Sequence, residues 1–256
     1  MTAKEKIRKS TTIGSWLSSG SMIIADLMTK AGLDWLVLDH EHSMMDYETI
    51  QGLIVQTQAN RCLSFVRVGA NDALIIKKFL DAGADGVIVP MIKSLAEAKQ
   101  AVQNVYYPTT GSRGVGLYRA QAYSYGFEDY VERHQKELVL IVQIEHIQAL
   151  QELEQILQVP EIDGIIVGPY DLSASMGIPG QFEHPEFLKA LKKIESLAKG
   201  SGKAMGVHVI QPEHQQVLEK QKAGYNFIAF SLDFLLLGKK LRDELGSIKK
   251  SMGGSL

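Results

Sequence analysis

Eight short apolar runs, spaced along the whole chain, constrain the fold more than any other feature. They are rich in β-branched residues and fall at 12–17, 35–41, 63–69, 86–92, 138–145, 164–169, 204–210 and 227–233. Segments with helical periodicity separate them, so strand and helix alternate throughout. Near-continuous apolar strands are typical of a parallel sheet covered by helices, and eight such units favour closure. The sequence therefore predicts an α/β fold of the (β/α)₈ barrel type, with an open doubly wound sheet as the alternative.

Local signals mark where several of the intervening helices begin and end. Ser94 and Glu97 have the spacing of a capping box, and Pro212 occupies the place of a first-turn proline. Gly83 and Gly224 stand where helices are expected to end. The longest connection, 106–137, is rich in Gly, Tyr and Arg, which favours a functional loop or a subunit contact.

The chain is expected to form one domain, residues 1–256, with the barrel at about 11–235. At 256 residues and 45% hydrophobic content, it has enough material for one large core. We find no internal repeat, low-complexity tract or linker. An amphipathic helix is predicted at 234–250, followed by a loose end, "SMGGSL", at 251–256.

Charge and cysteine content narrow the classes of partner. The formal net charge is −2 and the charged residues are interspersed, so we expect neither nucleic acid nor a membrane as partner. The first residues lack the apolar stretch of a secretory signal. Cys62 is the only cysteine, so no internal disulfide can form, which suits a reducing cytoplasm. A small polar or anionic metabolite remains the expected ligand.

Ionisable and polar residues concentrate at the carboxyl ends of four predicted strands, where barrel enzymes place their active sites. They are Asp39, Glu41, His42, Arg67, Gln143, Glu145 and Asp171. Gln143 and Glu145 are two residues apart, so their side chains share one face of a strand. Adjacent strands lie about 4.8 Å apart, which lets Glu145 and Asp171 converge. Two close carboxylates repel unless a proton or cation separates them, and an all-oxygen site suits Mg²⁺ or Mn²⁺ better than zinc.

Other polar residues have plainer interpretations. Arg67 taken alone could neutralise a buried carboxylate, and Lys93 fits the solvated start of a helix better than a Schiff base. The roles of His40 and His208 stay open. The remaining histidines are expected at the surface; they are His134, His146, His184 and His214.

With these residues in view, the sequence resembles the HpcH/HpaI aldolase family, the metal-dependent class II pyruvate aldolases. The matching blocks include "GSWL" at 14–17, "AGLDWLVLDHEHSMMD" at 31–46, "VQIEHIQAL" at 142–150 and "DGIIVGPYDLSASMG" at 163–177. The resemblance covers about residues 12–235. It implies a TIM barrel of the phosphoenolpyruvate/pyruvate type, whose C-terminal helix packs on a neighbouring subunit of a homohexamer.

The resemblance also implies roles for individual residues. Glu145 and Asp171 would bind the divalent metal, either Mg²⁺ or Mn²⁺ with Co²⁺ as a third candidate, and no organic cofactor is expected. His42 would be the catalytic base, held by Asp39, and Arg67 would face the keto-acid oxygen. Backbone amides near Gly168 and Pro169, towards Ser173, would receive the substrate carboxylate, and Gln143 would contact the substrate. The residues implied in substrate binding are Trp16, Gln143, Gly168, Pro169 and Ser173.

The expected reaction is reversible cleavage of a 4-hydroxy-2-oxo acid into pyruvate and an aldehyde. A divalent ion and Arg67 would stabilise the developing enolate, while His42 would manage the proton of the 4-hydroxyl. The alternatives are an acyl-CoA lyase of the citrate lyase β type, which would need a basic groove for CoA, and a catalytically silent barrel. The identity of the aldehyde stays open.

Overall fold

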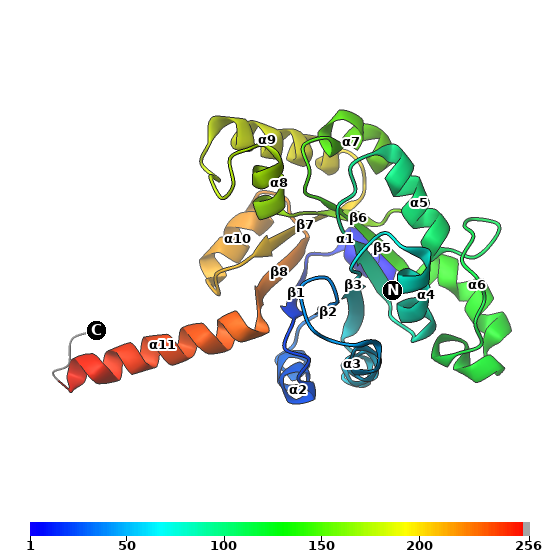
Figure 1. Cartoon of the computed structure of the whole chain (residues 1–256), viewed down its shortest axis with the longest axis horizontal. Coiled ribbons are helices and arrows are strands. Elements are labelled where there is room, and N and C mark those ends of the chain that lie inside the picture. The colour runs from blue at the N-terminus through cyan, green and yellow to red at the C-terminus, as the bar shows by residue number, and fades with distance from the viewer. Residues whose placement is uncertain (253–256) are drawn as a thin grey trace.

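The computed structural model of the protein describes residues 1–252 and shows a closed barrel of eight parallel strands in sequence order (Figure 1). The strands are β1 (Thr12–Leu17), β2 (Trp35–Asp39), β3 (Leu63–Arg67), β4 (Gly86–Val89), β5 (Val139–Ile144), β6 (Gly164–Val167), β7 (Ala204–Val209) and β8 (Phe227–Leu232). Each falls within the predicted run, so the barrel prediction is confirmed. Of the predicted loose end, residues 253–256 lie outside the described residues.

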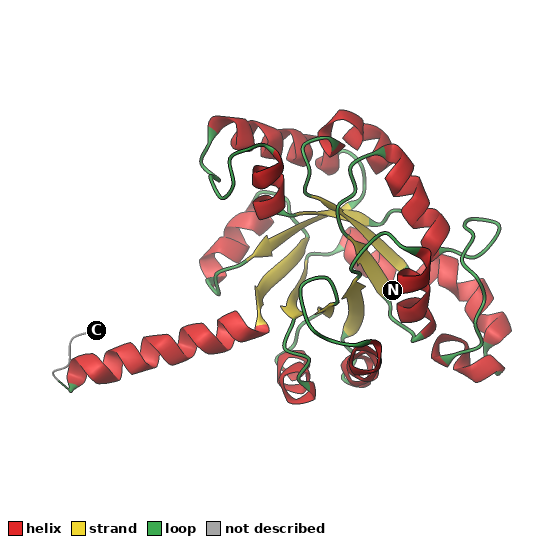
Figure 2. Ribbon diagram, viewed as in Figure 1, coloured by secondary structure: helices red, strands yellow, loops and turns green. Residues whose placement is uncertain are grey.

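Helices surround the strands on the outside of the barrel (Figure 2). They are α1 (Ala3–Lys9), α2 (Met22–Lys30), α3 (Tyr47–Ala59), α4 (Ala73–Asp81), α5 (Leu95–Val105), α6 (Phe127–Glu137), α7 (Ala149–Gln158), α8 (Pro169–Ser175), α9 (Pro185–Lys199), α10 (His214–Lys222) and α11 (Asp233–Ser251), with a 3₁₀ segment, η1 (Arg119–Ser124). The long predicted connection at 106–137 thus contains η1 and α6. No helix within residues 1–252 has both the length and the apolar character needed to cross a membrane.

Most of the predicted helix boundaries are confirmed. The Ser94 hydroxyl accepts a hydrogen bond from the Glu97 N–H at the start of α5. Gly83 and Gly224 follow α4 and α10 with φ of +94° and +99°, a left-handed conformation that glycine adopts without strain. The first-turn position predicted for Pro212 is wrong, because α10 begins two residues later, after Glu213.

The barrel interior is filled by alternate residues of the strands. The Trp35 ring stacks on Phe227 with ring centroids 4.1 Å apart. Gly14 makes room for that ring, since a Cβ there would lie 2.0 Å from it. Ile7 of α1 belongs to the same cluster, so α1 closes the amino-terminal end of the barrel.

At that end, one hydrogen-bond pattern occurs four times. The residues just before β2, β4, β6 and β8 are Asp34, Asp85, Asp163 and Asn226. Each side chain accepts a hydrogen bond of 2.8–2.9 Å from a backbone N–H of the preceding strand. The backbone N–H of each of these four residues donates to the carbonyl of the residue whose N–H its side chain accepts. The backbone carbonyl of each accepts from the N–H of the first residue of β3, β5, β7 and β1, respectively. We call these four residues the basal belt; it is a local repeat that the sequence analysis missed.

Helix α11 extends away from the barrel (Figure 1). The predicted helix at 234–250 is therefore confirmed. It carries an exposed apolar stripe of Phe234, Leu237, Leu241, Leu245 and Ile248.

Candidate active site

The carboxyl end of the barrel carries a polar layer directly above the apolar interior. Because strand side chains alternate, the residue two positions beyond an inward-facing core residue also faces inward. Val37, Phe65 and Ile141 lie in the interior cluster, so β2, β3 and β5 turn their next inward residues toward the axis. Glu41 and Glu145 follow Asp39 and Gln143 by two further positions, just beyond the ends of β2 and β5. The polar layer consists of Trp16, Asp39, Glu41, Arg67, Gln143, Glu145 and His208.

Arg67 and Asp39 form a bidentate ion pair at neighbouring positions of β3 and β2. The guanidinium donates from Nε to Asp39 Oδ1 at 2.9 Å and from its terminal nitrogen to Oδ2 at 2.8 Å. Burial opposes ionisation of Asp39, but the Arg67 bonds and charge outweigh it and hold the pKa of that carboxyl below its usual value. Arg67 also lies over the Trp16 ring, 4.4 Å from the centroid. The guanidinium is therefore fixed in place before any substrate binds.

The structure alters the relation predicted between Asp39 and His42. The Asp39 carboxylate accepts from the backbone N–H of His42 at 3.3 Å, and Arg67 occupies the sites where an imidazole would bind. The His42 side chain is 64% exposed, with Nε2 3.7 Å from Glu41 Oε2. The expectation that Asp39 orients the His42 ring is thus wrong: Asp39 fixes the backbone of the turn, and Glu41 lies beside the ring.

Glu145 is the most deeply buried carboxylate of this layer, at 2% exposure. Its Oε1 accepts a 2.7 Å hydrogen bond from the Met91 N–H, and its Oε2 accepts from Gln143 Nε2. Burial is the main cause that raises the pKa of Glu145 to about 7, and the nearby Glu41 and Asp171 charges add to it. A cation at this point would relieve both effects.

Asp171 lies in the first turn of α8 and is exposed. Its charge raises the pKa of Glu145 and of Glu41, so the three carboxylates share one electrostatic environment. Two buried oxygens of this environment, Glu41 Oε2 and Gln143 Oε1, accept no hydrogen bond from the described residues. That Glu145 and Asp171 together bind a metal ion stays a prediction.

This donor set fits a hard divalent ion. The described part of the chain contains no group of three or more His, Cys, Asp or Glu side chains arranged around a metal. Two carboxylates would leave most coordination positions to water and substrate, which is the usual arrangement around Mg²⁺. Glu145 and Asp171 are the residues that would hold the ion.

The turn that opens α8 is shaped by Gly168. A Cβ at this residue would lie 2.5 Å from Glu145 Oε2 and 3.0 Å from Gln143 Nε2, so only glycine fits beside the carboxylate. Pro169 begins the helix and has no N–H to offer a substrate. Ser173 is fully buried; its hydroxyl donates to the Tyr170 carbonyl and accepts from the Gly180 N–H. The Ser173 hydroxyl is thus used within the loop, and the contact of the substrate carboxylate with backbone amides towards Ser173 stays a prediction.

Two residues of this layer were not assigned from the sequence. Glu41 lies 3.3 Å from Arg67 Nε, and its spacing of two from Asp39 was the available signal. His208 packs on Trp16, with centroids 5.7 Å apart, and its Nε2 lies 3.0 Å from the Ser231 carbonyl. Burial lowers the pKa of His208 to about 4, so the ring is neutral near pH 7.

Two other histidines lie away from this layer. His40 packs between Tyr47 of α3 and Phe79 of α4, which places it among the helices. His134 was expected at the surface, and this is wrong. It is 4% exposed, with Nδ1 2.8 Å from the Val131 carbonyl.

Known proteins resemble this chain over nearly its full length. The 2-keto-3-deoxy-L-rhamnonate aldolase of Escherichia coli O9:H4 (strain HS) is 36% identical over 98% of this chain and 94% of the relative. The enzyme of that name from Klebsiella pneumoniae is 37% identical over 95% of this chain and 91% of the relative. The crystal structure of a HpcH/HpaI aldolase/citrate lyase family protein from Burkholderia cenocepacia J2315 superposes with a TM-score of 0.90 at 31% identity, covering 96% of this chain and 98% of that one.

The family model described as HpcH/HpaI aldolase/citrate lyase matches residues 12–238. That span includes every strand of the barrel and each residue of the polar layer. The chain belongs to the HpcH/HpaI aldolase/citrate lyase family, as its sequence predicted.

Proposed function

We propose that this protein is a divalent-metal-dependent class II aldolase that reversibly cleaves a 4-hydroxy-2-oxo acid into pyruvate and an aldehyde. The observation that carries the proposal is the buried Glu145 carboxylate, whose pKa is raised by burial and by the Asp171 charge, in the same polar layer as the bidentate Arg67–Asp39 pair. Cleavage leaves an electron pair on the carbon next to the keto group. An enzyme must stabilise that enolate where it forms.

Arg67 is the side chain suited to the developing negative charge. Its two bonds to Asp39 use one edge of the guanidinium and hold it rigid, at 13% exposure. The planar group stays charged at any physiological pH and has further N–H donors for a keto or carboxylate oxygen. Asp39 therefore acts by positioning Arg67.

His42 is the proposed acid and base for the 4-hydroxyl proton. Its ring is exposed to solvent, with Nε2 3.7 Å from Glu41 Oε2. Cleavage needs a group that accepts this proton, and the reverse addition needs its return. Gln143, turned into the same layer, supplies an unpaired amide oxygen for substrate.

Glu145 and Asp171 would hold Mg²⁺ or Mn²⁺, with Co²⁺ as a third candidate. When bound, such an ion acts as a Lewis acid that polarises the 2-oxo group. The Gly168 turn and the Met91 N–H keep the Glu145 carboxylate in position for it.

The relatives suggest a 2-keto-3-deoxy sugar acid as the substrate class. Both full-length relatives described above are named for 2-keto-3-deoxy-L-rhamnonate. Cleavage of that six-carbon acid between C3 and C4 would yield pyruvate and a three-carbon hydroxyaldehyde. The acyl-CoA lyase alternative is not favoured, because these relatives are aldolases.

We further propose that the protein is a homo-oligomer and works in the cytoplasm. The exposed apolar stripe of α11 extends beyond the barrel, and contact with a second subunit would remove it from water. The cytoplasmic location is supported by the single cysteine, which leaves no internal disulfide to form. Cys62 is free and buried, and burial raises its pKa to about 12, so the thiol is unreactive.

The first test is proton NMR of pyruvate in D₂O with the purified protein and Mg²⁺. Loss of the methyl signal that stops with a chelator would support enolate formation without needing the aldehyde. Pyruvate release from 2-keto-3-deoxy-L-rhamnonate, measured with lactate dehydrogenase, then tests the substrate. Glu145→Gln is the control, and exchange that persists in this variant at the same Mg²⁺ concentration would contradict the proposed site.

A further inference from the structure

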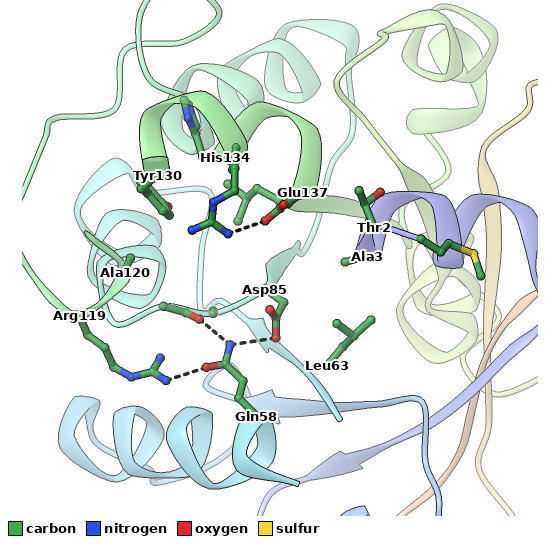
Figure 3. A pocket seen from close by; sticks show the side chains of 15 residues that line it. Thr2, Ala3, Gln58, Leu63, Asp85, Arg119, Ala120, Tyr130, His134 and Glu137 are labelled. Atoms are coloured by element: carbon green, nitrogen blue, oxygen red, sulfur yellow. Dashed lines mark hydrogen bonds and ion pairs between the residues drawn. The ribbon is translucent and has the colours of Figure 1, made fainter. Parts of the chain in front are cut away.

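A polar cavity lies at the amino-terminal end of the barrel, opposite the polar layer. It has a volume of about 520 Å³ and is enclosed by the start of α1, the end of α3, η1 and α6 (Figure 3). This volume falls within the range of small-molecule sites. Four charged side chains line it, namely Asp85, Arg119, Arg133 and Glu137.

In three members of the basal belt, the second polar atom of the side chain pairs with a residue of α1. Asp34 Oδ1 binds Lys6 at 2.8 Å. Asp163 Oδ1 binds Arg8, at 2.9 Å from Nε. The Asn226 amide donates to backbone carbonyls of α1. At each acidic position, a cation from the same helix neutralises the carboxylate.

Asp85 is the fourth member and lacks such a cation. Its Oδ2 accepts from the Ser64 N–H at 2.8 Å and from Gln58 Nε2 at 3.0 Å. Its Oδ1 has no hydrogen bond or ion pair with the residues that the structure describes, and the residue lines the cavity. Figure 3 shows the Asp85 carboxylate projecting into the space between Gln58 and Glu137. Burial is the main cause that raises the pKa of Asp85; the Gln58 and Ser64 bonds and the Arg119 charge lower it, and the Glu137 charge adds to the rise.

We propose that this cavity binds a small amino-acid-like zwitterion, with its ammonium group on Asp85 Oδ1. The Asp34 position shows what the geometry accepts, because Lys6 presents an ammonium group to Asp34 in the equivalent arrangement. The bound cation would complete the belt at the one acidic position to which α1 supplies no cation. Glu137 lines the same cavity, where its carboxylate is paired with Arg133 at 3.1 Å.

The arginines of the cavity would bind the carboxylate of the ligand. Arg119 donates to the Ala82 carbonyl at 2.9 Å and to Gln58 Oε1 at 2.8 Å, so its positive charge is held in a fixed position. Arg133 bonds Glu137 at 3.1 Å across one turn of α6 and is half exposed, so it can turn toward a carboxylate. A site with both signs of charge favours a zwitterion over a simple anion or cation.

The test uses the full-length protein and four probes: L-lysine, L-arginine, butylamine as the cation-only compound and hexanoate as the anion-only compound. Saturation-transfer NMR detects binding, and titration calorimetry gives the dissociation constant. The variant Asp85→Asn keeps the bond from Ser64, because Asn226 makes the same bond in the same place. The matched control is Asp34→Asn, an equivalent belt position outside the cavity.

We expect at least one amino acid to bind more tightly than butylamine or hexanoate. Asp85→Asn should weaken it by about tenfold or more, as loss of a charge-assisted hydrogen bond predicts, while Asp34→Asn should leave it unchanged. Both variants should retain aldolase activity. The inference is overturned if neither amino acid binds at millimolar concentration, or if the two variants weaken binding equally.

Discussion

The substitution Gly168→Ala tests whether the position of the Glu145 carboxylate controls activity. The added Cβ would lie 2.5 Å from Glu145 Oε2, and restoring ordinary contact at 3.4 Å moves that oxygen by about 0.9 Å. The backbone of Gly168, with φ of −96°, is allowed for alanine, so the effect is steric. A misplacement of about 1 Å at a catalytic site costs roughly 100-fold in rate. We therefore expect turnover to fall by about two orders of magnitude.

The assay measures initial rates of pyruvate release at saturating Mg²⁺, together with the Mn²⁺ dissociation constant. We expect weaker Mn²⁺ binding and a loss of about 1–3 kcal/mol in unfolding free energy from overpacking. The matched control is Gly52→Ala in α3, where the nearest atom to the new Cβ is 3.9 Å away. That change should preserve activity and stabilise the helix by about 0.5–1 kcal/mol. Wild-type turnover and Mn²⁺ affinity in Gly168→Ala would refute the reasoning.

Three further predictions concern charged residues. Arg67→Ala should lower turnover by about 100-fold or more, measured by initial rates. Mn²⁺ binding, measured by calorimetry, should stay largely intact. The unfolding free energy should fall by about 3–5 kcal/mol, because Asp39 is left buried without its partner. The metal-free protein should lose stability as pH rises from about 4.5 to about 7, because the folded-state pKa of Glu145 is raised to about 7. Urea unfolding with a chelator should show a loss of roughly 3 kcal/mol across that window, absent in Glu145→Gln. Arg8→Ala should cost about 1–3 kcal/mol in unfolding free energy, because the buried Asp163 carboxylate then keeps only Lys4, 3.5 Å away, as its cation. Turnover should be unchanged, and a drop in turnover would contradict the separation of the two barrel ends.

Periodicity and local chemistry were enough to predict much of the site. The spacing of two between Gln143 and Glu145 placed both on one strand face, and the end of β2 placed Asp39 next to Arg67. These relations follow from the geometry of a single strand and its neighbour. They require no knowledge of how loops turn.

Side-chain partners beyond the strand ends could not be predicted in this way. Asp39 binds Arg67 and the backbone of His42, because the turn after β2 points the imidazole outward toward Glu41. The Ser173 hydroxyl accepts from the Gly180 N–H because the loop after α8 folds back, which the sequence did not indicate. In both cases a loop conformation decided which of several available donors reached the group.

The sequence by itself determined the eight-stranded barrel, the family and the end of the barrel at which its carboxylates gather. Hydrophobic periodicity and strand alternation are local properties, so they can be read from the order of residues. The tertiary structure alone decided which charges are compensated. Asp163 and Asp85 occupy equivalent positions before β6 and β4, but only Asp163 meets a cation from α1. That difference depends on where α1, which is distant in sequence from both residues, crosses the amino-terminal end of the barrel. The strength of a buried charge interaction depends on distances that only the folded chain sets.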